Sequence, residues 1–495
     1  MDGISYWIEK RSLIMPGRIA VITEDYGNVT YEELNKRIFR MAGFLKADLS
    51  VERGDRIAIL SQNSIDYLVM LFAIAKLEAV AVPLNIRLTI NELAYQVNDS
   101  GTKLLFADQD HSEKASALAE VCNIRYFSEM EPGSSHEISD ISFEPIDENA
   151  SFLICYTSGT TGKPKGAVLT QKNMFWNAIN NMLAIDLTSN DRSIVLLPLF
   201  HIGGIGLFAL PTLFAGGTVI IPGKFEAEKA LKMMERCKAT IVMGVPAIHQ
   251  ALLGHPAFSK TNLESVRWFY NGGAPCPSEL FSKYKGQGHI LGQGFGMTET
   301  SPTLFMLSRE DADRKPGSIG KPVMYSEYEL LDANGQLAAP GEVGEIAVRG
   351  PNIMKQYWNR PDATEEAWHG GWFLTGDLAR KDEEGFLYIV GRKKEMIISG
   401  GENIYPLEVE QAIGQLKEVK EVAVVGVSDP KWGEVPVAFV VLEDEGSLTS
   451  DEVKEHCEKH LGRYKIPKEI RFLHELPKNA TGKIQKNALG KIIQK

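Results

Sequence analysis

The stretch YTSGTTGKPKG, residues 156–166, says more about the fold than any other part of the sequence. It follows the apolar run FLIC, so we expect a loop that leaves a strand. Its glycines let backbone N–H groups approach a ligand, its hydroxyl groups donate hydrogen bonds, and its lysines offset negative charge, which favours a phosphate-binding loop. It is not a Walker A loop, because Gly159 does not begin GxxxxGKS/T and Pro164 stands where a helix would begin. A polar turn without a ligand is the competing interpretation.

Short apolar strands alternate with amphipathic helices on both sides of this loop. Thr30 and Glu33 have the spacing of a capping box at the start of a helix. The apolar run 67–84 is interrupted by Lys76, Glu78 and Pro83, so it predicts a buried helix running into a strand rather than a membrane span. Strands are also expected at 56–60, 193–199, 218–221 and 240–245, and a helix at 227–237. The alternation predicts a layered α/β fold with largely parallel sheets.

The pattern changes after about Gly341. Strands are expected at 344–348, 385–390, 422–427 and 435–442, and a capping box at Thr449 and Glu452 opens a helix. We therefore predict two domains: a large α/β domain over residues 1–391 and a small, mobile α+β domain over residues 392–495.

The bulk composition narrows the classes of function. A net charge of -11 argues against a general nucleic-acid binder, which needs a basic face. The five cysteines are scattered and show no CxxC spacing, which fits a reducing compartment and excludes a disulfide framework. The N-terminus lacks the charge and apolar order of a signal peptide, so we expect a cytoplasmic protein.

Four further segments carry weaker signals. GQGFGMTET, residues 292–300, offers an amide at Gln293, an aromatic face at Phe295, and hard oxygens at Thr298 and Glu299 of the kind Mg²⁺ takes. Asp377 in FLTGDLA is either a turn residue or a partner for ribose hydroxyls. The other two are GRKKEMIISGGENIYP, residues 391–406, and PKNATGKIQK, residues 477–486.

In this order and spacing the five segments resemble the adenylate-forming superfamily, which includes acyl-CoA synthetases, aryl-CoA ligases, firefly luciferase and peptide-synthetase adenylation domains. The resemblance runs from about Thr30 to Lys486. It implies an enzyme that uses Mg²⁺ and works in two half-reactions. A carboxylate attacks the α-phosphate of ATP to give acyl-AMP and pyrophosphate, and a thiol, coenzyme A, then displaces AMP.

The resemblance also assigns residues to the adenylation step. Lys483 matches the lysine that bridges the carboxylate and the α-phosphate, where its charge stabilises the transition state. Thr298 matches a phosphate contact, Glu299 the magnesium ligand, and His201 an aromatic switch residue. The implied ATP contacts are Thr157, Ser158, Gly159, Thr160, Thr161, Gly162, Lys163, Lys165, Gly272, Gly273, Ala274, Gln293, Gly294, Phe295, Asp377 and Arg392.

The thiol and acid sites follow in the same way. Lys394 matches a hinge about which relatives rotate the small domain. The implied coenzyme A contacts are Arg87, Ser399, Gly400, Gly401, Trp432, Tyr464, Lys465 and Lys468. The implied acyl pocket is lined by His201, Gly203, Gly204, Leu207, Val245, Pro246, Gly296 and Met297.

The acid is expected to be apolar, because residues 200–208 contain no carboxylate to pair with an ammonium group. The glycines of HIGGIGL, residues 201–207, predict a roomy pocket and thus a medium- or long-chain fatty acid. The alternatives are an aryl acid of the coumarate, benzoate or succinylbenzoate type, and a carrier-protein acceptor in place of coenzyme A. Small molecules are the expected partners, with peripheral membrane contact only for a long-chain acid.

Overall fold

The computed structural model describes residues 3–24, 27–128, 146–157, 163–274, 276–443, 446–478 and 484–493. The chain forms two compact units: unit 1 comprises Met1–Tyr328 and Val348–Phe373, and unit 2 comprises Glu329–Ala347 and Leu374–Lys495. A large α/β unit and a smaller C-terminal unit confirm the predicted fold class. The predicted domain division at residues 391 and 392 concerns a hinge and stays a prediction.

The first sheet of unit 1 has the strand order β15-β14-β13-β12-β11-β9-β10-β1-β2. The five pairings from β13 through to β1 are parallel, and the pairings at the two ends are antiparallel. The strands are β1 (Ile19–Thr23), β2 (Gly27–Thr30), β9 (Arg192–Val195), β10 (Thr218–Ile221), β11 (Ile241–Gly244), β12 (Trp268–Asn271), β13 (Leu291–Phe295), β14 (Phe305–Met306) and β15 (Lys321–Pro322).

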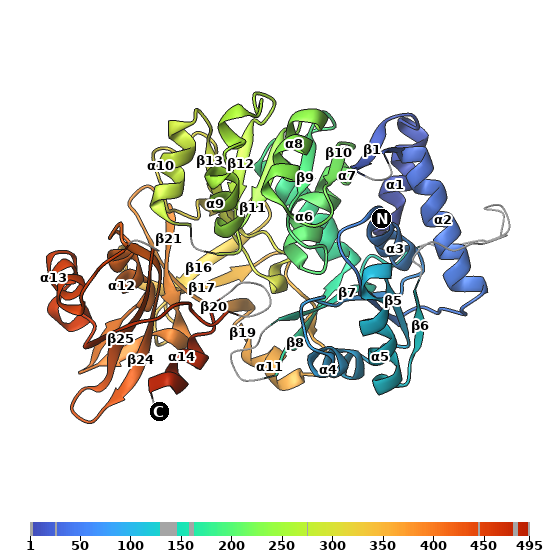
Figure 1. The fold of residues 1–495 in the computed structure, drawn as a ribbon. Helices are drawn as coiled ribbons and strands as arrows, with labels where there is room; N and C mark the ends of the chain where they lie inside the picture. Colours follow the sequence, from blue (N-terminus) through green and yellow to red (C-terminus); the bar gives the residue numbers. More distant parts are fainter. Residues whose placement is uncertain are drawn as a thin grey trace. The chain divides into compact units, whose positions relative to one another are not determined.

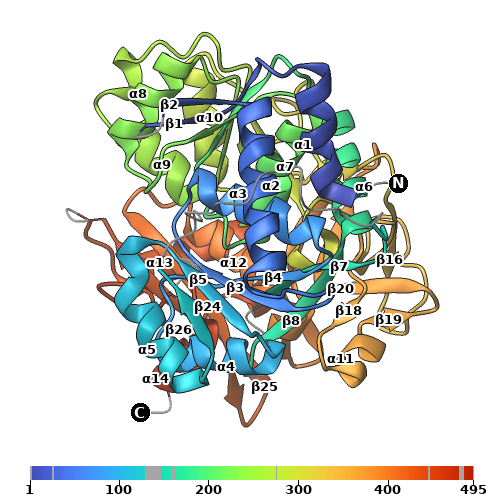
Figure 2. The ribbon, with the colours of Figure 1, turned by 90° about the vertical axis from the view of Figure 1, so that its right-hand side faces the viewer.

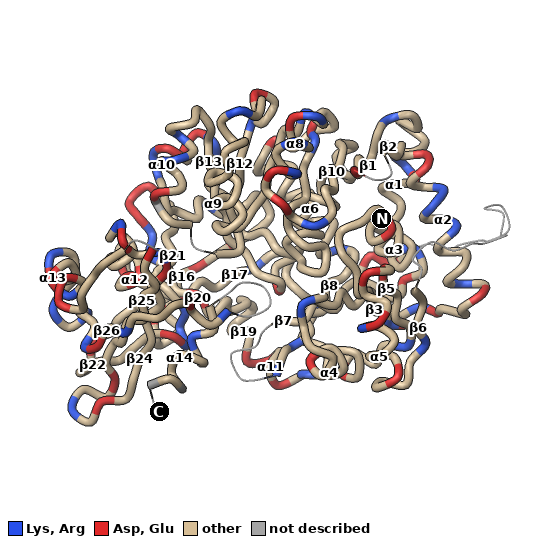
Figure 3. Tube along the Cα trace, viewed as in Figure 1, with Lys and Arg blue, Asp and Glu red and all other residues tan. Residues whose placement is uncertain are grey.

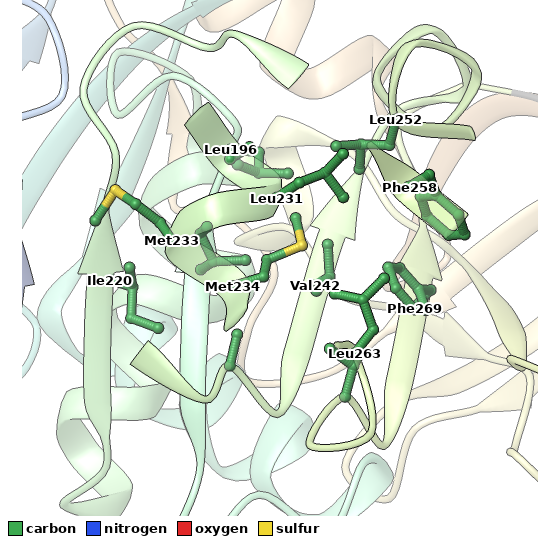
Figure 4. Packing of buried hydrophobic residues seen from close by; sticks show 14 of the residues in the cluster. Leu196, Ile220, Leu231, Met233, Met234, Val242, Leu252, Phe258, Leu263 and Phe269 are labelled. Carbon is green, nitrogen blue, oxygen red and sulfur yellow. The ribbon is translucent and has the colours of Figure 1, made fainter. Parts of the chain in front are cut away.

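Side chains alternate between the two faces of this sheet, as a strand requires. Val242 and Phe269 face a core formed with helices α8 (Ala227–Cys237), α9 (Pro246–Gly254) and α10 (Ser278–Gly286), which lie along the sheet in Figure 1. Figure 4 shows Leu231, Met234 and Leu252 packed against these strands. Met243 and Tyr270 face a second cluster that includes Phe208. Both faces are therefore covered, as expected for a largely parallel sheet.

The second sheet of unit 1 has the order β18-β8-β7-β4-β3-β5-β6. The pairings among β7, β4, β3, β5 and β6 are parallel, whereas β8 pairs antiparallel with β7 and with β18. The strands are β3 (Arg56–Leu60), β4 (Val80–Pro83), β5 (Leu104–Ala107), β6 (Arg125–Phe127), β7 (Ser151–Thr157), β8 (Lys165–Thr170) and β18 (Gln356–Tyr357).

The remaining helices of unit 1 include α3, which is almost entirely buried and runs into β4, as the sequence predicts. Figure 2 shows α1, α2 and α3 close together. Among the described residues, no helix is long and apolar enough to cross a membrane. These helices are α1 (Gly3–Ile14), α2 (Tyr31–Ala47), α3 (Ile65–Lys76), α4 (Ile90–Ser100), α5 (Ser112–Cys122), α6 (Gln171–Ala184), α7 (Leu210–Ala215) and α11 (Pro361–Glu366).

The two predicted capping boxes differ in the structure. At Thr449 both reciprocal bonds with Glu452 are present. At Thr30 the hydroxyl accepts from the Glu33 N–H at 3.2 Å, but the Glu33 carboxylate accepts from Arg37 one turn further on. The Thr30 box is thus only half formed, because an ion pair within α2 takes the carboxylate.

Unit 2 contains a sheet of order β23-β22-β25-β24, with β26 beside β25, and helices α12, α13 and α14. Acidic and basic residues are interspersed along α13 (Figure 3). The elements are β22 (Ile397–Ser399), β23 (Glu402–Ile404), α12 (Pro406–Ile413), β24 (Val419–Asp429), β25 (Gly433–Leu442), α13 (Ser450–His460), β26 (Glu469–Phe472) and α14 (Lys486–Ile493).

The remaining strands form a five-stranded sheet of order β16-β17-β20-β19, in which β21 pairs antiparallel with β20. They are β16 (Glu327–Leu331), β17 (Val343–Arg349), β19 (Trp368–His369), β20 (Trp372–Lys381) and β21 (Leu387–Arg392).

Candidate active site

The predicted phosphate loop connects two antiparallel strands, β7 and β8, so it is the turn of a hairpin. Thr157 pairs with Lys165 at the base of this turn. The predicted contacts Ser158, Gly159, Thr160, Thr161 and Gly162 lie outside the described residues. The two lysines that follow lie over aromatic rings: Lys163 Nζ is 5.6 Å from the Tyr95 ring centroid and Lys165 Nζ is 4.1 Å from that of Tyr357.

Both ends of the hairpin turn are tied to helix α4. The Tyr156 hydroxyl donates to Asp99 Oδ2 at 2.7 Å, and the Tyr95 hydroxyl donates to the Pro164 carbonyl at 3.1 Å. Arg360 donates to Asp99 Oδ1 and to the Tyr95 hydroxyl, both at 2.9 Å. Burial and then the Asp99 carboxylate raise the pKa of Tyr156 far above its ordinary value, so this hydroxyl keeps its proton and donates. Sequence reasoning missed this cluster because Asp99 and Arg360 lie far from the loop in the chain.

Glu299, the predicted magnesium ligand, is 5% exposed in a short 3₁₀ turn, Thr298–Thr300. Its Oε1 accepts a hydrogen bond from the Tyr357 hydroxyl at 2.7 Å. Within the described part of the chain it has no salt-bridge partner, and no group of three potential metal ligands occurs. A buried carboxylate without a cationic partner fits a site for a cation. Mg²⁺ is commonly held by one carboxylate together with phosphate oxygens, so these residues fit that ion.

The predicted adenine side is formed where β12 and β13 end next to each other. Asn271 is in register with Gln293 in the neighbouring strand. Residues 272–274, which follow β12, therefore start beside residues 294–295, the end of β13. The Gln293 Nε2 group donates to the carbonyls of Gly317 and Ser318 at 3.3 Å, while its buried Oε1 has no partner among the described residues. The Phe295 ring lies 6.2 Å from Phe305. The structure thus leaves an amide acceptor at this strand end.

The glycines around 272–294 reflect close packing. A Cβ at Gly272 would lie 2.8 Å from Met243 Cε, and one at Gly294 would lie 2.4 Å from the Tyr270 hydroxyl. Gly273 has a φ of +80°, which favours glycine. Ala274 follows it and is exposed.

The glycines of residues 201–207 are expected to leave a roomy pocket, and this is wrong at Gly204 and Gly206; Gly296, in the same predicted pocket, is packed just as closely. A Cβ at Gly204 would lie 2.2 Å from the Pro198 carbonyl oxygen, one at Gly206 would lie 2.6 Å from the Ser301 carbonyl oxygen, and one at Gly296 would lie 1.5 Å from the Pro302 carbonyl oxygen. These three positions are occupied by neighbouring backbone rather than by open space. At Gly203 the nearest atom is Leu197 Cδ1, at 3.3 Å.

The segment after His201 is a π-helix, Gly203–Ala209, which contains Leu207 and runs into α7. Burial and then the nearby Arg87 charge lower the pKa of His201 to about 4. The His201 ring is therefore neutral at pH 7. The other predicted pocket residues lie at strand ends: Val245 and Pro246 follow β11, and Met297 follows β13.

Buried asparagines of α6 hold this π-helix, and sequence reasoning missed them. Asn177 Nδ2 donates to the Gly206 carbonyl at 2.6 Å, and its Oδ1 accepts from the Thr303 N–H at 3.2 Å. Asn181 Nδ2 donates to the Thr303 hydroxyl at 2.8 Å. The α6 helix thus connects the predicted acid pocket to the backbone that follows Glu299.

The predicted ribose contacts lie in unit 2. Asp377 and Arg392 are paired across β20 and β21, with Arg392 Nε 3.1 Å from Asp377 Oδ1. The predicted hinge residue Lys394 lies in the 3₁₀ turn Lys393–Glu395 directly after this strand.

The predicted thiol passage, also in unit 2, begins at the turn between β22 and β23. Gly400 and Gly401 have φ values of +59° and +89° after Ser399, as a two-residue hairpin turn requires. A Cβ at Gly400 would lie 2.8 Å from the Trp432 ring. The turn geometry and Trp432 therefore explain both glycines without reference to a ligand.

Of the predicted coenzyme A contacts in unit 2, two present exposed rings and two are lysines with carboxylate partners. Trp432 and Tyr464 are 46% and 44% exposed. Lys465 pairs with Glu408 at 2.7 Å, and Lys468 pairs with Asp429. Arg87 belongs to unit 1, where it is exposed.

Lys483 lies outside the described residues, which end at Lys478 before it and resume at Ile484. Lys478 and Ile484 form an antiparallel bridge, and the Gln485 N–H donates to the Pro477 carbonyl at 2.8 Å. Lys486 pairs with Glu410 at 2.7 Å and with Glu395, beside the predicted hinge residue, at 3.1 Å.

The chain belongs to the AMP-binding enzyme family: the AMP-binding enzyme model matches residues 8–358, and the AMP-binding enzyme C-terminal domain model matches residues 408–483. It is accordingly an AMP-forming acid–thiol ligase. This confirms the family and the class of reaction inferred from the sequence.

Three relatives show the range of acids. A feruloyl-CoA synthase of Amycolatopsis sp is 41% identical, over 98% of both chains. The o-succinylbenzoate CoA synthetase of Bacillus subtilis, in complex with its acyl-adenylate, is 37% identical and has a TM-score of 0.90 over 99% of this chain and 98% of that one. The structure of the same enzyme with ATP and magnesium is 36% identical and has a TM-score of 0.89 over 98% of both chains. A fatty acyl CoA synthetase of Mycobacterium tuberculosis is 33% identical, with a TM-score of 0.80 over 99% and 98%. The expected fatty acid is thus less well supported than the aryl alternative.

Proposed function

We propose that this enzyme activates an aryl acid of the hydroxycinnamate type and transfers it to coenzyme A. The observation that carries the proposal is the 41% identity to a feruloyl-CoA synthase over nearly the whole length of both chains. The fatty-acid expectation depended on open space at the glycines of residues 201–207, and backbone atoms fill that space at Gly204 and Gly206.

The composition of the predicted pocket supports a monocarboxylic acid. Its segments 201–207, 245–247, 272–274 and 296–297 contain no lysine or arginine, and His201 is neutral at pH 7. A succinylbenzoate has a second carboxylate, which is costly to bury without a cationic or hydrogen-bonding partner. A ferulate or coumarate presents only an apolar ring with neutral substituents. The same segments contain no carboxylate for an amino-acid ammonium group.

In the first half-reaction the substrate carboxylate oxygen bonds to the α-phosphorus, and the bond between the α-phosphorus and the bridging oxygen breaks, so pyrophosphate leaves. Lys163, Lys165 and the predicted loop contacts among residues 158–162 bind the phosphates of ATP. Thr298 donates to phosphate, and Lys483 stabilises charge that develops on the α-phosphate oxygens. Glu299 would hold Mg²⁺, which when bound neutralises phosphate charge.

In the second half-reaction the coenzyme A sulfur bonds to the acyl carbon, the carbon–oxygen bond to AMP breaks, and the thiol proton passes to water. Trp432 and Tyr464 offer exposed rings for the nucleotide end of coenzyme A. Lys465 and Lys468 must exchange Glu408 and Asp429 for phosphate if they bind this end. Lys394 is the hinge between the two half-reactions.

The test is a panel of acids with constant enzyme, Mg-ATP and coenzyme A, with acyl-CoA, AMP and ADP followed by mass spectrometry. We expect AMP and the thioesters of ferulic and 4-coumaric acids, with kcat/KM about 10-fold or more above those for succinylbenzoic, benzoic and C8–C16 fatty acids. A preference for succinylbenzoate or for a fatty acid would contradict the proposed substrate. AMP without acyl-CoA would contradict coenzyme A as the acceptor.

A further inference from the structure

Residues 356–360 form a short segment that contacts three parts of the predicted ATP site in unit 1. Strand β18 pairs with β8, the return strand of the phosphate hairpin, so that Tyr357 is opposite Ala167. The Trp358 N–H then donates to the Gly166 carbonyl at 2.7 Å. The backbone of this segment is therefore bonded to the end of the phosphate loop.

The Tyr357 side chain extends from this segment to Glu299. Its hydroxyl donates to Glu299 Oε1 at 2.7 Å, in an environment where both side chains are buried. The Glu299 carbonyl also accepts from the Met354 N–H at 2.7 Å. The hydroxyl bond fixes the rotation of the carboxylate, because one oxygen is held by Tyr357 and the other is left for a ligand.

The ring of Tyr357 contacts the phosphate loop as well. Lys165 Nζ lies 4.1 Å from its centroid, a distance at which a cation is attracted to an aromatic face. One side chain thus places both a carboxylate for the metal and a cation for the phosphates.

The segment is itself fixed to helix α4. Trp358 Nε1 donates to the Asp99 carbonyl at 2.9 Å, and Arg360 pairs with the Asp99 carboxylate at 2.9 Å. Asp99 Oδ2 accepts from Tyr156, which precedes the phosphate loop. Tyr156, on the N-terminal side of the loop, and the Tyr357 segment therefore share one anchor, Asp99.

From these contacts we propose that Tyr357 is a positioning residue that orients Glu299 for the magnesium–nucleotide complex. The proposal rests on the proposed function, because it takes Glu299 as the metal ligand. Residues that hold a metal ligand through a hydrogen bond commonly change metal affinity by about 10- to 100-fold when they are removed.

The test uses Tyr357→Phe, which deletes the hydroxyl and keeps the ring. Tyr31→Phe is the matched control, because the Tyr31 hydroxyl is also buried and donates to the Gly217 carbonyl at 2.7 Å, away from the site. ATP binding to each purified protein is measured by calorimetry with Mg²⁺ and, separately, with EDTA, and Tm is measured in parallel.

We expect Tyr357→Phe to bind Mg-ATP about 10-fold more weakly than the wild type, with little change for metal-free ATP. Tyr31→Phe should have a lower Tm than the wild type, while its Mg-ATP affinity stays at the wild-type value. An unchanged Mg-ATP affinity in Tyr357→Phe, or an equal loss with and without Mg²⁺, would overturn the proposal. Failure of the proposed function would instead show in the wild type, as no AMP-forming turnover with aryl acids.

Discussion

His249 is a fully buried histidine whose hydrogen bonds determine its tautomer and whose burial keeps it neutral. Its Nε2 lies 3.0 Å from the Tyr270 carbonyl, which can only accept, so Nε2 carries the proton. Its Nδ1 then accepts from the Tyr284 hydroxyl at 2.8 Å. Burial lowers the pKa of this ring to about 4, and it stays neutral in the folded enzyme at pH 7.

The His249 pKa predicts how stability depends on pH. Between about pH 6.5 and pH 4 the unfolded chain binds a proton at this ring and the folded chain does not, so stability decreases as the pH falls. His249 contributes a loss of about 3 kcal/mol over this window. Urea denaturation at pH 7 and at pH 4.5 should show a smaller difference for His249→Gln than for the wild type. Equal differences would contradict this assignment.

The adjacent glycines Gly203 and Gly204 offer a matched pair. Gly204→Ala places a Cβ 2.2 Å from the Pro198 carbonyl oxygen, so we expect a loss of about 3 kcal/mol and a clearly lower Tm. Gly203→Ala meets only the ends of two flexible side chains, Leu197 Cδ1 at 3.3 Å and Leu207 Cδ1 at 3.7 Å, so it should fold and mainly change the KM for the acid. Thermal scans and kinetics of both variants test this prediction. Equal Tm values would show that the backbone contact at Gly204 relaxes.

The glycines also show the limits of sequence reasoning at the residue scale. From the sequence, Gly204 and Gly206 indicate space for substrate, because a glycine has no side chain and the sequence does not show which atoms pack against it. The atoms that fill this space, at Pro198 and Ser301, approach only through the tertiary fold. Glu299 and Asp377, by contrast, occur in local motifs, and the structure places both as buried carboxylates.

At the scale of a single element, helix α6 buries polar side chains that its sequence indicates to be exposed. It has four buried asparagines, whose partners are the π-helix, Thr303, Tyr325 and the carbonyls of residues 351 and 353: Asn173, Asn177, Asn180 and Asn181. A helix with so many polar residues reads as exposed from its sequence. Their burial is stable because the buried backbone groups of an irregular segment need side-chain partners for their hydrogen bonds.

Asn177→Ala should therefore be costly. It leaves the buried Gly206 carbonyl and the Thr303 N–H without this partner, for which we expect a loss of about 3 kcal/mol in urea denaturation. Asn190→Ala is the control, because the Asn190 side chain only accepts an exposed hydrogen bond from Arg18, and the substitution should change stability by less than about 0.5 kcal/mol. Similar losses for the two variants would contradict the role of α6.

Helices and strands were predicted best where one hydrophobic periodicity dominates the sequence. The sequence places β3, β10 and α8 with the bounds found in the structure, because each has an uninterrupted apolar pattern. The hairpin that holds the phosphate loop and the π-helix after His201 were not predicted. The first depends on pairing with a strand across a glycine-rich turn, and the second on bonds from α6.

On the scale of the whole molecule, the proposed role of Lys483 in adenylation predicts that the two half-reactions respond differently to its loss. We expect Lys483→Ala to reduce acyl-AMP formation by about 100-fold or more, because the charge that stabilises the α-phosphate transition state is lost. Thioester formation from supplied acyl-AMP should change far less. Rapid-quench measurement of both steps tests this prediction, and an equal loss in both would contradict the assigned role.

The most direct test of the central claim is a single-turnover reaction with ferulic acid and Mg-ATP in the absence of coenzyme A, analysed by mass spectrometry. We expect feruloyl-AMP to accumulate on the enzyme with release of pyrophosphate. Addition of coenzyme A should then convert it to feruloyl-CoA and AMP. Formation of ADP, or the absence of any feruloyl-AMP while a fatty acid gives its adenylate, would contradict the claim that this chain is an aryl acid–CoA ligase.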